Sequence, residues 1–98
     1  MDVIRRVVIR GRVQGVGFRA WTEVTALERG IQGWVRNCRD GSVEALFIGP
    51  PDVVAAMIAA CDEGPPGSRV DGVDQREGSR AEAALRRRGE LFSVLASP

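Results

Sequence analysis

Two glycines separate two different repeats of apolar side chains near the start of the chain. Before them, Val7, Ile9 and Val13 alternate with polar residues, which is typical of a strand with one buried face. After them, apolar residues recur at helical spacing and predict the buried face of a helix: Ala20, Val24, Leu27 and Ile31. A strand that enters a helix through Gly15 and Gly17 constrains the fold, because the next strand of the same sheet then runs parallel to the first.

The pair Asp40-Gly41 predicts a β-hairpin further along the chain. Residues 33–38 before it are expected to form a strand, with Trp34 as its large apolar anchor. Residues 42–48 after it are expected to return as a second strand of the hairpin. Alternation gives this returning strand one apolar face: Val43, Ala45 and Phe47.

A second helix is predicted after Pro50 and Pro51, and Gly64 is expected to end it. Its apolar residues again have helical spacing: Val54, Met57, Ile58 and Cys61. A weak strand over residues 69–76 follows. The order β-α-β-β-α-β predicts an α+β fold, a split β-α-β sandwich with two helices on one face of an antiparallel sheet. We expect the first strand at the centre of that sheet.

The C-terminal segment carries weaker signals. Ser79 and Glu82 have the spacing of a capping box, so residues 79–89 are either a short helix or a charged, loosely ordered loop. Residues 90–97 contain enough apolar side chains for a last strand at the sheet edge.

Composition excludes several kinds of chemistry. The 98 residues contain no histidine, and all 14 cationic side chains are arginine. This rules out Ser-His-Asp and Cys-His nucleophiles, histidine metal sites and catalysis by lysine. The formal net charge of +1 provides no broad basic surface for nucleic acid or for an acidic membrane.

The two cysteines, Cys38 and Cys61, are too few for a disulfide framework or a four-thiolate zinc site. We expect free thiols in a reducing cytoplasm. No apolar stretch approaches the roughly 18 residues of a membrane span, and the N-terminal apolar run contains arginines, unlike a signal peptide.

The glycine loop and the arginine after it suggest an anion site. Successive N–H groups of such a loop can converge on an anion, the start of a helix adds positive charge, and Arg19 adds a planar fork of donors. A tight strand-to-helix turn with a solvated Arg19 explains the same residues, and loop chemistry alone leaves both interpretations open. The string GVGFRA also matches a dinucleotide fingerprint, but the hairpin that follows and the short chain do not fit that fold.

Asn37 ends the second predicted strand, just before the hairpin. It is either a turn-favouring residue or an amide that orients a water molecule beside the anion. The second interpretation requires that the loops after the first and second strands share one end of the sheet. Parallel strands joined through a helix meet that requirement.

The strings GRVQGVGFR and GWVRNCRDGSVEALFIGP, with CDEGPPGSRV further on, closely resemble the acylphosphatase family over about residues 5–76. The resemblance implies a ferredoxin-like fold, with residues 1–98 as a single acylphosphatase-like domain. It also implies hydrolysis of the carboxyl-phosphate bond of acyl phosphates to carboxylate and inorganic phosphate. The segment from Ser79 to Gly89 is longer than the family pattern, and Arg29 stands where the family often has an apolar residue.

The same resemblance implies roles for individual residues. Arg19 matches the phosphate-binding arginine of the family, and Asn37 its water-orienting asparagine. The family loop that binds phosphate through backbone N–H groups falls on five positions: Gln14, Gly15, Val16, Gly17 and Phe18. The resemblance implies no metal and no cofactor, and a substrate oxygen as the acceptor of the water's proton. We expect a cytoplasmic monomer that acts on a small acyl phosphate, with neither nucleic acid nor membrane as partner.

Two other functions fit parts of this pattern. One is a catalytically weak phosphate- or carbamoyl-phosphate-binding module of the same fold, as found inside larger hydrogenase-maturation enzymes; the short single domain favours the enzyme instead. The other is RNA binding, which needs exposed aromatic side chains on the central strands. Phe47 is the only aromatic residue on the first and third strands, and we expect it in the core.

Overall fold

Five strands form one sheet with the spatial order β4-β1-β3-β2-β5. The computed structural model describes residues 1–98. Its elements are β1 (Val3–Arg12), α1 (Phe18–Glu28), β2 (Gln32–Asn37), β3 (Val43–Gly49), α2 (Pro51–Glu63), β4 (Arg69–Glu77), α3 (Arg80–Ala83) and β5 (Phe92–Val94). Both β1 and β2 are antiparallel to β3, so they run parallel to each other. The loops after β1 and β2 therefore open at the same end of the sheet.

The predicted split β-α-β sandwich of the ferredoxin-like type is confirmed, with two corrections to the sheet. The sheet is mixed rather than antiparallel, because β5 adds to the outer edge of β2 in the parallel direction. In addition, β3 occupies the middle position that was expected for the first strand. Both differences come from the C-terminal strand, which extends the sheet on the side of β2.

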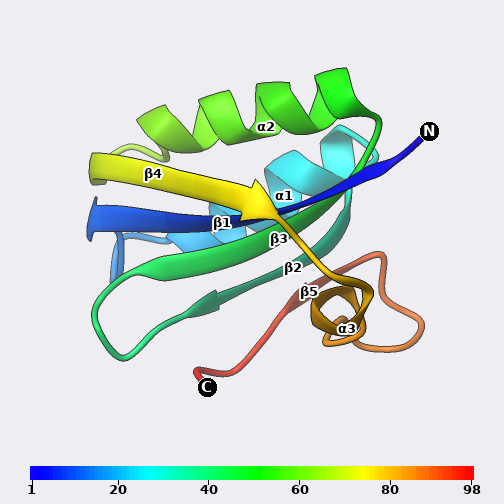
Figure 1. Ribbon diagram of the computed structural model, residues 1–98. Helices are drawn as coiled ribbons and strands as arrows, with labels where there is room; N and C mark the ends of the chain where they lie inside the picture. The colour runs from blue at the N-terminus through cyan, green and yellow to red at the C-terminus, as the bar shows by residue number, and fades with distance from the viewer.

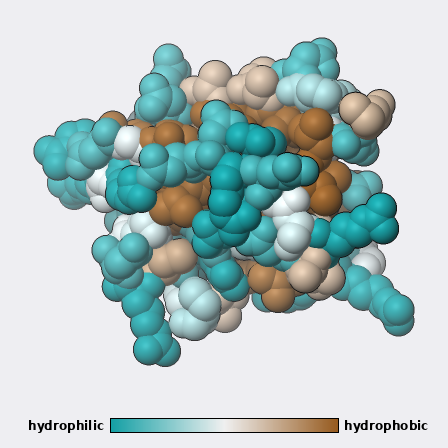
Figure 2. All heavy atoms as spheres, in the orientation of Figure 1, coloured by the Kyte–Doolittle hydropathy of each residue, from teal (hydrophilic) through white to brown (hydrophobic).

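Helices α1 and α2 cover one face of the sheet (Figure 1). The core lies between them and the strands, and its fully buried strand residues include three that alternation predicted in the third strand: Val43, Ala45 and Phe47. The predicted face of α2 is also buried, with Val54 and Met57 at its centre. Figure 2 shows hydrophobic residues gathered along the boundary between α2 and the strands, with hydrophilic side chains projecting around them.

The predicted buried face of the first helix is wrong. Val24 and Leu27 are 55% and 45% exposed, and the face turned to the sheet carries Phe18, Thr22 and Ala26. A threonine can occupy the core here because its hydroxyl donates a 2.8 Å hydrogen bond to the carbonyl oxygen of Phe18. The polar group is satisfied within the helix, so its burial has little cost.

The opposite face of the sheet is partly covered by α3 (Figure 1). Trp34 is fully buried there, outside the main core, and its indole N–H donates a 2.8 Å hydrogen bond to the carbonyl oxygen of Glu82. The expected capping box at Ser79 is present, because Ser79 and Glu82 exchange side-chain to backbone hydrogen bonds. The segment over residues 79–89 therefore begins with a short helix at residues 80–83 and continues mostly in turns, and the sheet has a second, smaller covered surface.

Arginines and glutamates beneath α3 form a connected ion network. Glu44, only 2% exposed, pairs with Arg6 and with Arg36 of the neighbouring strands. Glu82 of α3 pairs with Arg6 and with Arg76, the second at 2.5 Å. The network joins four strands, β1, β2, β3 and β4, to α3 through charge-assisted hydrogen bonds.

We expect this ion network to make the free energy of unfolding depend on pH in the acidic range. The Arg76 guanidinium, followed by the Ser79 N–H, lowers the pKa of Glu82 from 4.5 to about 2. A carboxyl whose folded pKa is depressed stabilises the fold above its unfolded pKa, and this contribution is lost as the pH falls from about 4.5 through about 2. In urea unfolding, Glu82→Gln should therefore flatten the decline in the free energy of unfolding across that window. Glu28→Gln, which removes an exposed carboxyl without an ion pair, is the control; equal acid slopes in wild type and Glu82→Gln would contradict the prediction.

No helix has both the length and the apolar character needed to cross a bilayer.

Candidate active site

A cavity of about 300 Å³ lies at the end of the sheet where β1 and β2 both finish. It is lined by Val13, Gly15, Gly17, Phe18, Arg19, Ala20, Glu23, Asn37 and Val94. The parallel course of β1 and β2 brings the glycine loop and Asn37 together, although they are separated by a whole helix in the sequence. The spatial requirement stated for the water-orienting interpretation of Asn37 is thus met.

The loop between β1 and α1 holds unused hydrogen-bond donors. Gly15 and Gly17 have φ values of 73° and 79°, whereas Val16 between them has a negative φ. Alternating positive and negative φ values turn successive N–H groups toward one point, as in anion-binding nests. No N–H group of residues 14–17 donates to another backbone group, so these donors remain free for a ligand.

The first turn of α1 extends this set of donors. Gly17 is the N-cap residue, no side chain caps the helix, and the first turn contains no acidic residue. By contrast, Asp52 lies in the first turn of α2, and Ser79 caps α3. The uncapped N–H groups and the helix dipole make the start of α1 attractive to an anion.

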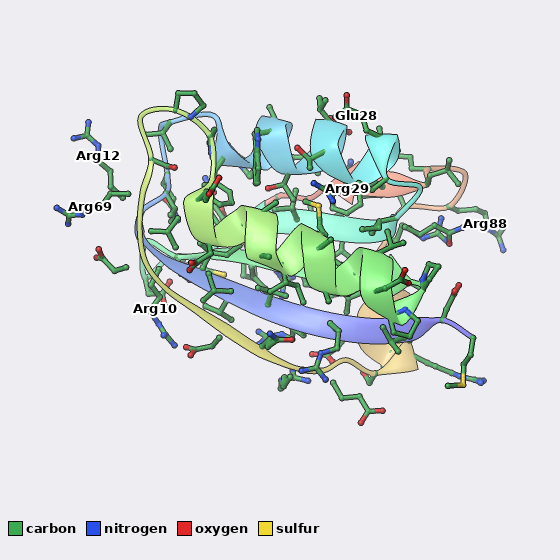
Figure 3. The ribbon with its side chains drawn as sticks, turned by 90° about the horizontal axis from the view of Figure 1, so that it is seen from above. Arg10, Arg12, Glu28, Arg29, Arg69 and Arg88 are labelled. Carbon is green, nitrogen blue, oxygen red and sulfur yellow. The ribbon has the colours of Figure 1, made fainter.

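Arg19 is the only cationic side chain that lines the cavity. It is exposed and takes part in no ion pair or side-chain hydrogen bond, so its fork of donors is available. Arg10, Arg12 and Arg69 project at the same end of the sheet (Figure 3). Of these three arginines, Arg10 and Arg69 pair with aspartates, whereas Arg12 forms no ion pair.

The side chain of Gln14 connects the loop to the hairpin. Its amide nitrogen donates to the carbonyl oxygens of Cys38 and Ser42, at 2.7 and 2.8 Å. Both acceptors belong to the connection between β2 and β3, and Cys38 directly follows Asn37. The glycine loop and Asn37 are therefore held in a fixed relation by one amide.

The hairpin itself is locked by Asp40. The hydroxyl and N–H of Ser42 donate to one carboxylate oxygen of Asp40, at 2.6 and 2.9 Å. The hydroxyl hydrogen bond, followed by the N–H, lowers the pKa of the Asp40 carboxyl. A rigid turn after Asn37 limits the positions that its side-chain amide can adopt.

The structure thus brings five of the predicted site residues to one cavity: Gly15, Gly17, Phe18, Arg19 and Asn37. Gln14 and Val16 do not line it; Gln14 contacts the hairpin, and Val16 packs against the core. Sequence reasoning missed Glu23 and Val94. Glu23 follows Arg19 by four residues on a helix, a spacing that could have placed it on the same side. Nothing local could have placed Val94 there.

Other reactive groups lie outside this arrangement. Cys61 is fully buried on the inner face of α2, and burial raises the pKa of its thiol to about 12, so it remains protonated. Cys38 is also a free thiol, but it does not line the cavity. No group of three or more histidine, cysteine, aspartate or glutamate side chains is placed to hold a metal ion.

The fold and the site together define a small ferredoxin-like α+β sandwich with hydrogen-bond donors converging at one end of its sheet. The sequence model of the acylphosphatase family matches residues 5–86. The chain belongs to the acylphosphatase family.

Individual relatives agree with this assignment. The chain is 61% identical to an acylphosphatase of Bradyrhizobium diazoefficiens over 94% of its own length and 93% of the relative's. It is 60% identical to an acylphosphatase of Nitrobacter hamburgensis over 96% and 95% of the two lengths. Among solved structures, the acylphosphatase from Bacillus subtilis superimposes with a TM-score of 0.81 at 36% identity, covering 97% of this chain and 99% of the other.

Proposed function

We propose that this protein hydrolyses the carboxyl-phosphate bond of acyl phosphates, giving a carboxylate and inorganic phosphate. The observation that carries the proposal is the meeting of the free N–H donors, Arg19 and Asn37 at one cavity. Family membership and close identity to proteins named acylphosphatase support the same reaction.

In this proposal the phosphoryl group sits at the start of α1. The backbone N–H groups of residues 14–18 and the guanidinium of Arg19 hold its oxygens and stabilise the charge that they carry in the transition state. These donors are suited to phosphate because they are numerous, fixed and uncommitted to other protein groups. Charge-assisted hydrogen bonds of this kind are stronger than neutral ones.

Asn37 then orients a water molecule toward phosphorus. The water oxygen forms the new bond, the bond from phosphorus to the acyl oxygen breaks, and the carboxylate leaves with the electron pair. A substrate phosphate oxygen accepts the proton of the water. A carboxylate is a good leaving group, so positioning and charge stabilisation supply most of the catalysis, without histidine or lysine.

The proposal includes a monomer in the cytoplasm. A single chain supplies every residue that lines the cavity, so no second copy is needed to complete the site. Two unpaired cysteines fit a reducing compartment. The module that binds phosphate without turnover is not favoured, because the relatives matched over more than nine-tenths of their length are named as acylphosphatases.

Hydrolysis of benzoyl phosphate in the presence of EDTA tests the proposal directly. We expect turnover at the same rate with and without the chelator, because the side chains assigned to the reaction are donors rather than metal ligands. Release of inorganic phosphate measures the rate. Intact benzoyl phosphate, together with tight binding of inorganic phosphate, would contradict the enzyme and favour the binding module.

A further inference from the structure

Glu23 is an acidic side chain in a cavity that otherwise suits an anion. It lines the same cavity as Arg19 and is partly buried. Neither Glu23 nor Arg19 forms an ion pair, with the other or with any other residue. The negative charge is therefore not neutralised within the protein. A carboxylate beside a phosphate site weakens binding of phosphate, so its presence there needs an explanation in the substrate.

The position of Glu23 along α1 separates it from the phosphate end of the cavity. Four residues of an α-helix span about 6 Å, so Glu23 lies one turn beyond Arg19 and beyond the free N–H groups. Val94 of β5 also lines the cavity, and β5 packs against α1. Ala20 also lines the cavity, and it lies between Arg19 and Glu23 along α1. With the phosphoryl group at the start of α1, the remaining space near Glu23 and Val94 is left for the acyl group.

We propose that Glu23 selects substrates by the charge of their acyl group. Resting on the proposed hydrolase function, this inference assigns the protein to acyl phosphates with a neutral or positively charged acyl group. Acyl phosphates with a second carboxylate or phosphate are disfavoured, because their extra negative charge would lie beside the Glu23 carboxylate. Val94 and Ala20 provide apolar contact for the uncharged part of the acyl group.

Three benzoyl phosphates whose para position is anionic, neutral or cationic test this proposal: 4-carboxybenzoyl phosphate, benzoyl phosphate and 4-(aminomethyl)benzoyl phosphate. For the wild type, kcat/KM should rise in that order. Glu23→Gln should reduce the preference for the neutral over the carboxylated substrate by about tenfold, the size expected for one charge interaction near a protein surface. The change should appear mainly in KM, because the charge acts on the acyl group rather than on the reacting phosphorus.

Glu28→Gln is the matched control. Glu28 is exposed at the far end of α1 (Figure 3) and does not line the cavity. The Glu28→Gln variant removes the same charge from the same helix but outside the cavity. The ratios of kcat/KM for the three substrates should therefore stay as in the wild type. An equal effect of both variants would assign the preference to net charge and would overturn a role of Glu23.

A second measurement requires no variant. Raising the ionic strength screens the carboxylate, so the wild-type preference for neutral over carboxylated substrate should shrink with added salt. A preference independent of salt, or a loss of activity in Glu23→Gln that is equal for all three substrates, would overturn the proposal while leaving the hydrolase function intact. Failure of the wild type to hydrolyse any of the three would reject both.

Discussion

Replacing Arg19 by alanine is expected to abolish hydrolysis of benzoyl phosphate and to remove binding of inorganic phosphate at the same time. Arg19 is the only cation lining the cavity, and it lies beside N–H donors that cannot replace its full charge. Because the guanidinium is proposed to contact the phosphoryl group both before and during the reaction, its loss should raise KM and lower kcat. We expect a fall in kcat/KM of at least about 10³-fold, the upper range for loss of one well-placed donor.

Two variants make this result interpretable. Arg29→Ala removes the same charge from the opposite end of α1, where Arg29 is exposed and lies outside the cavity, and should retain activity (Figure 3). Arg19→Lys keeps the charge but loses the planar fork, so it should recover only part of the phosphate affinity. Phosphate affinity is measured by competitive inhibition for the active variants and by calorimetry for Arg19→Ala. Activity of Arg19→Ala within about tenfold of the wild type would remove Arg19 from the proposed mechanism.

Asn37→Ala should separate catalysis from binding. Its side-chain amide is proposed to orient water rather than to hold phosphate, so kcat should fall by about 10²–10³-fold. The inhibition constant of inorganic phosphate should change by no more than about threefold, well under the 1.4 kcal/mol of a tenfold change. Steady-state kinetics with benzoyl phosphate, with phosphate as competitor, gives both quantities.

The control for Asn37 comes from the same strand. Gln32→Ala removes an exposed side-chain amide at the opposite end of β2, so kcat should be unchanged. If Asn37→Ala instead weakened phosphate binding as much as it lowered kcat, Asn37 would be a phosphate ligand and the water-orienting role would be wrong.

Much of this architecture could be predicted because its signals are local. The Asp-Gly pair marked the hairpin, and alternation placed Val43, Ala45 and Phe47 on the core face, where they are fully buried. The end of the sheet at which the cavity lies was predicted from three elements: the first strand, the glycine loop and the strand ending at Asn37. These features depend on backbone conformation and on the period of apolar residues within a few positions.

The errors arose where packing between distant elements decides the outcome. Val24 and Leu27 have helical spacing, yet the face of α1 that is buried carries Phe18, Thr22 and Ala26. Thr22 is polar, and the hydrogen bond to a helix carbonyl that allows its burial is not visible in the sequence. The parallel pairing of β5 with β2 depends on the path of the tail around α3, which no local pattern specifies.

The residues of the site also divide into those with local sequence signals and those placed by long-range packing. Arg19 and Asn37 were predicted because they lie within strings that resemble one family. Glu23 and Val94 were not, since their place at the cavity depends on the rotation of α1 and on the last strand.

The side-chain amide of Gln14 donates hydrogen bonds to both ends of the β2–β3 connection, and this affects the rate at which substrate associates. The glycine loop and Asn37 are already held in their relative positions before any ligand binds. The conformational entropy cost of ordering them is therefore part of folding and not of binding. Substrate then enters a preorganised site and need not wait for a lid to close. Encounter by diffusion, rather than a conformational rearrangement, sets the upper limit on the association rate of such a site.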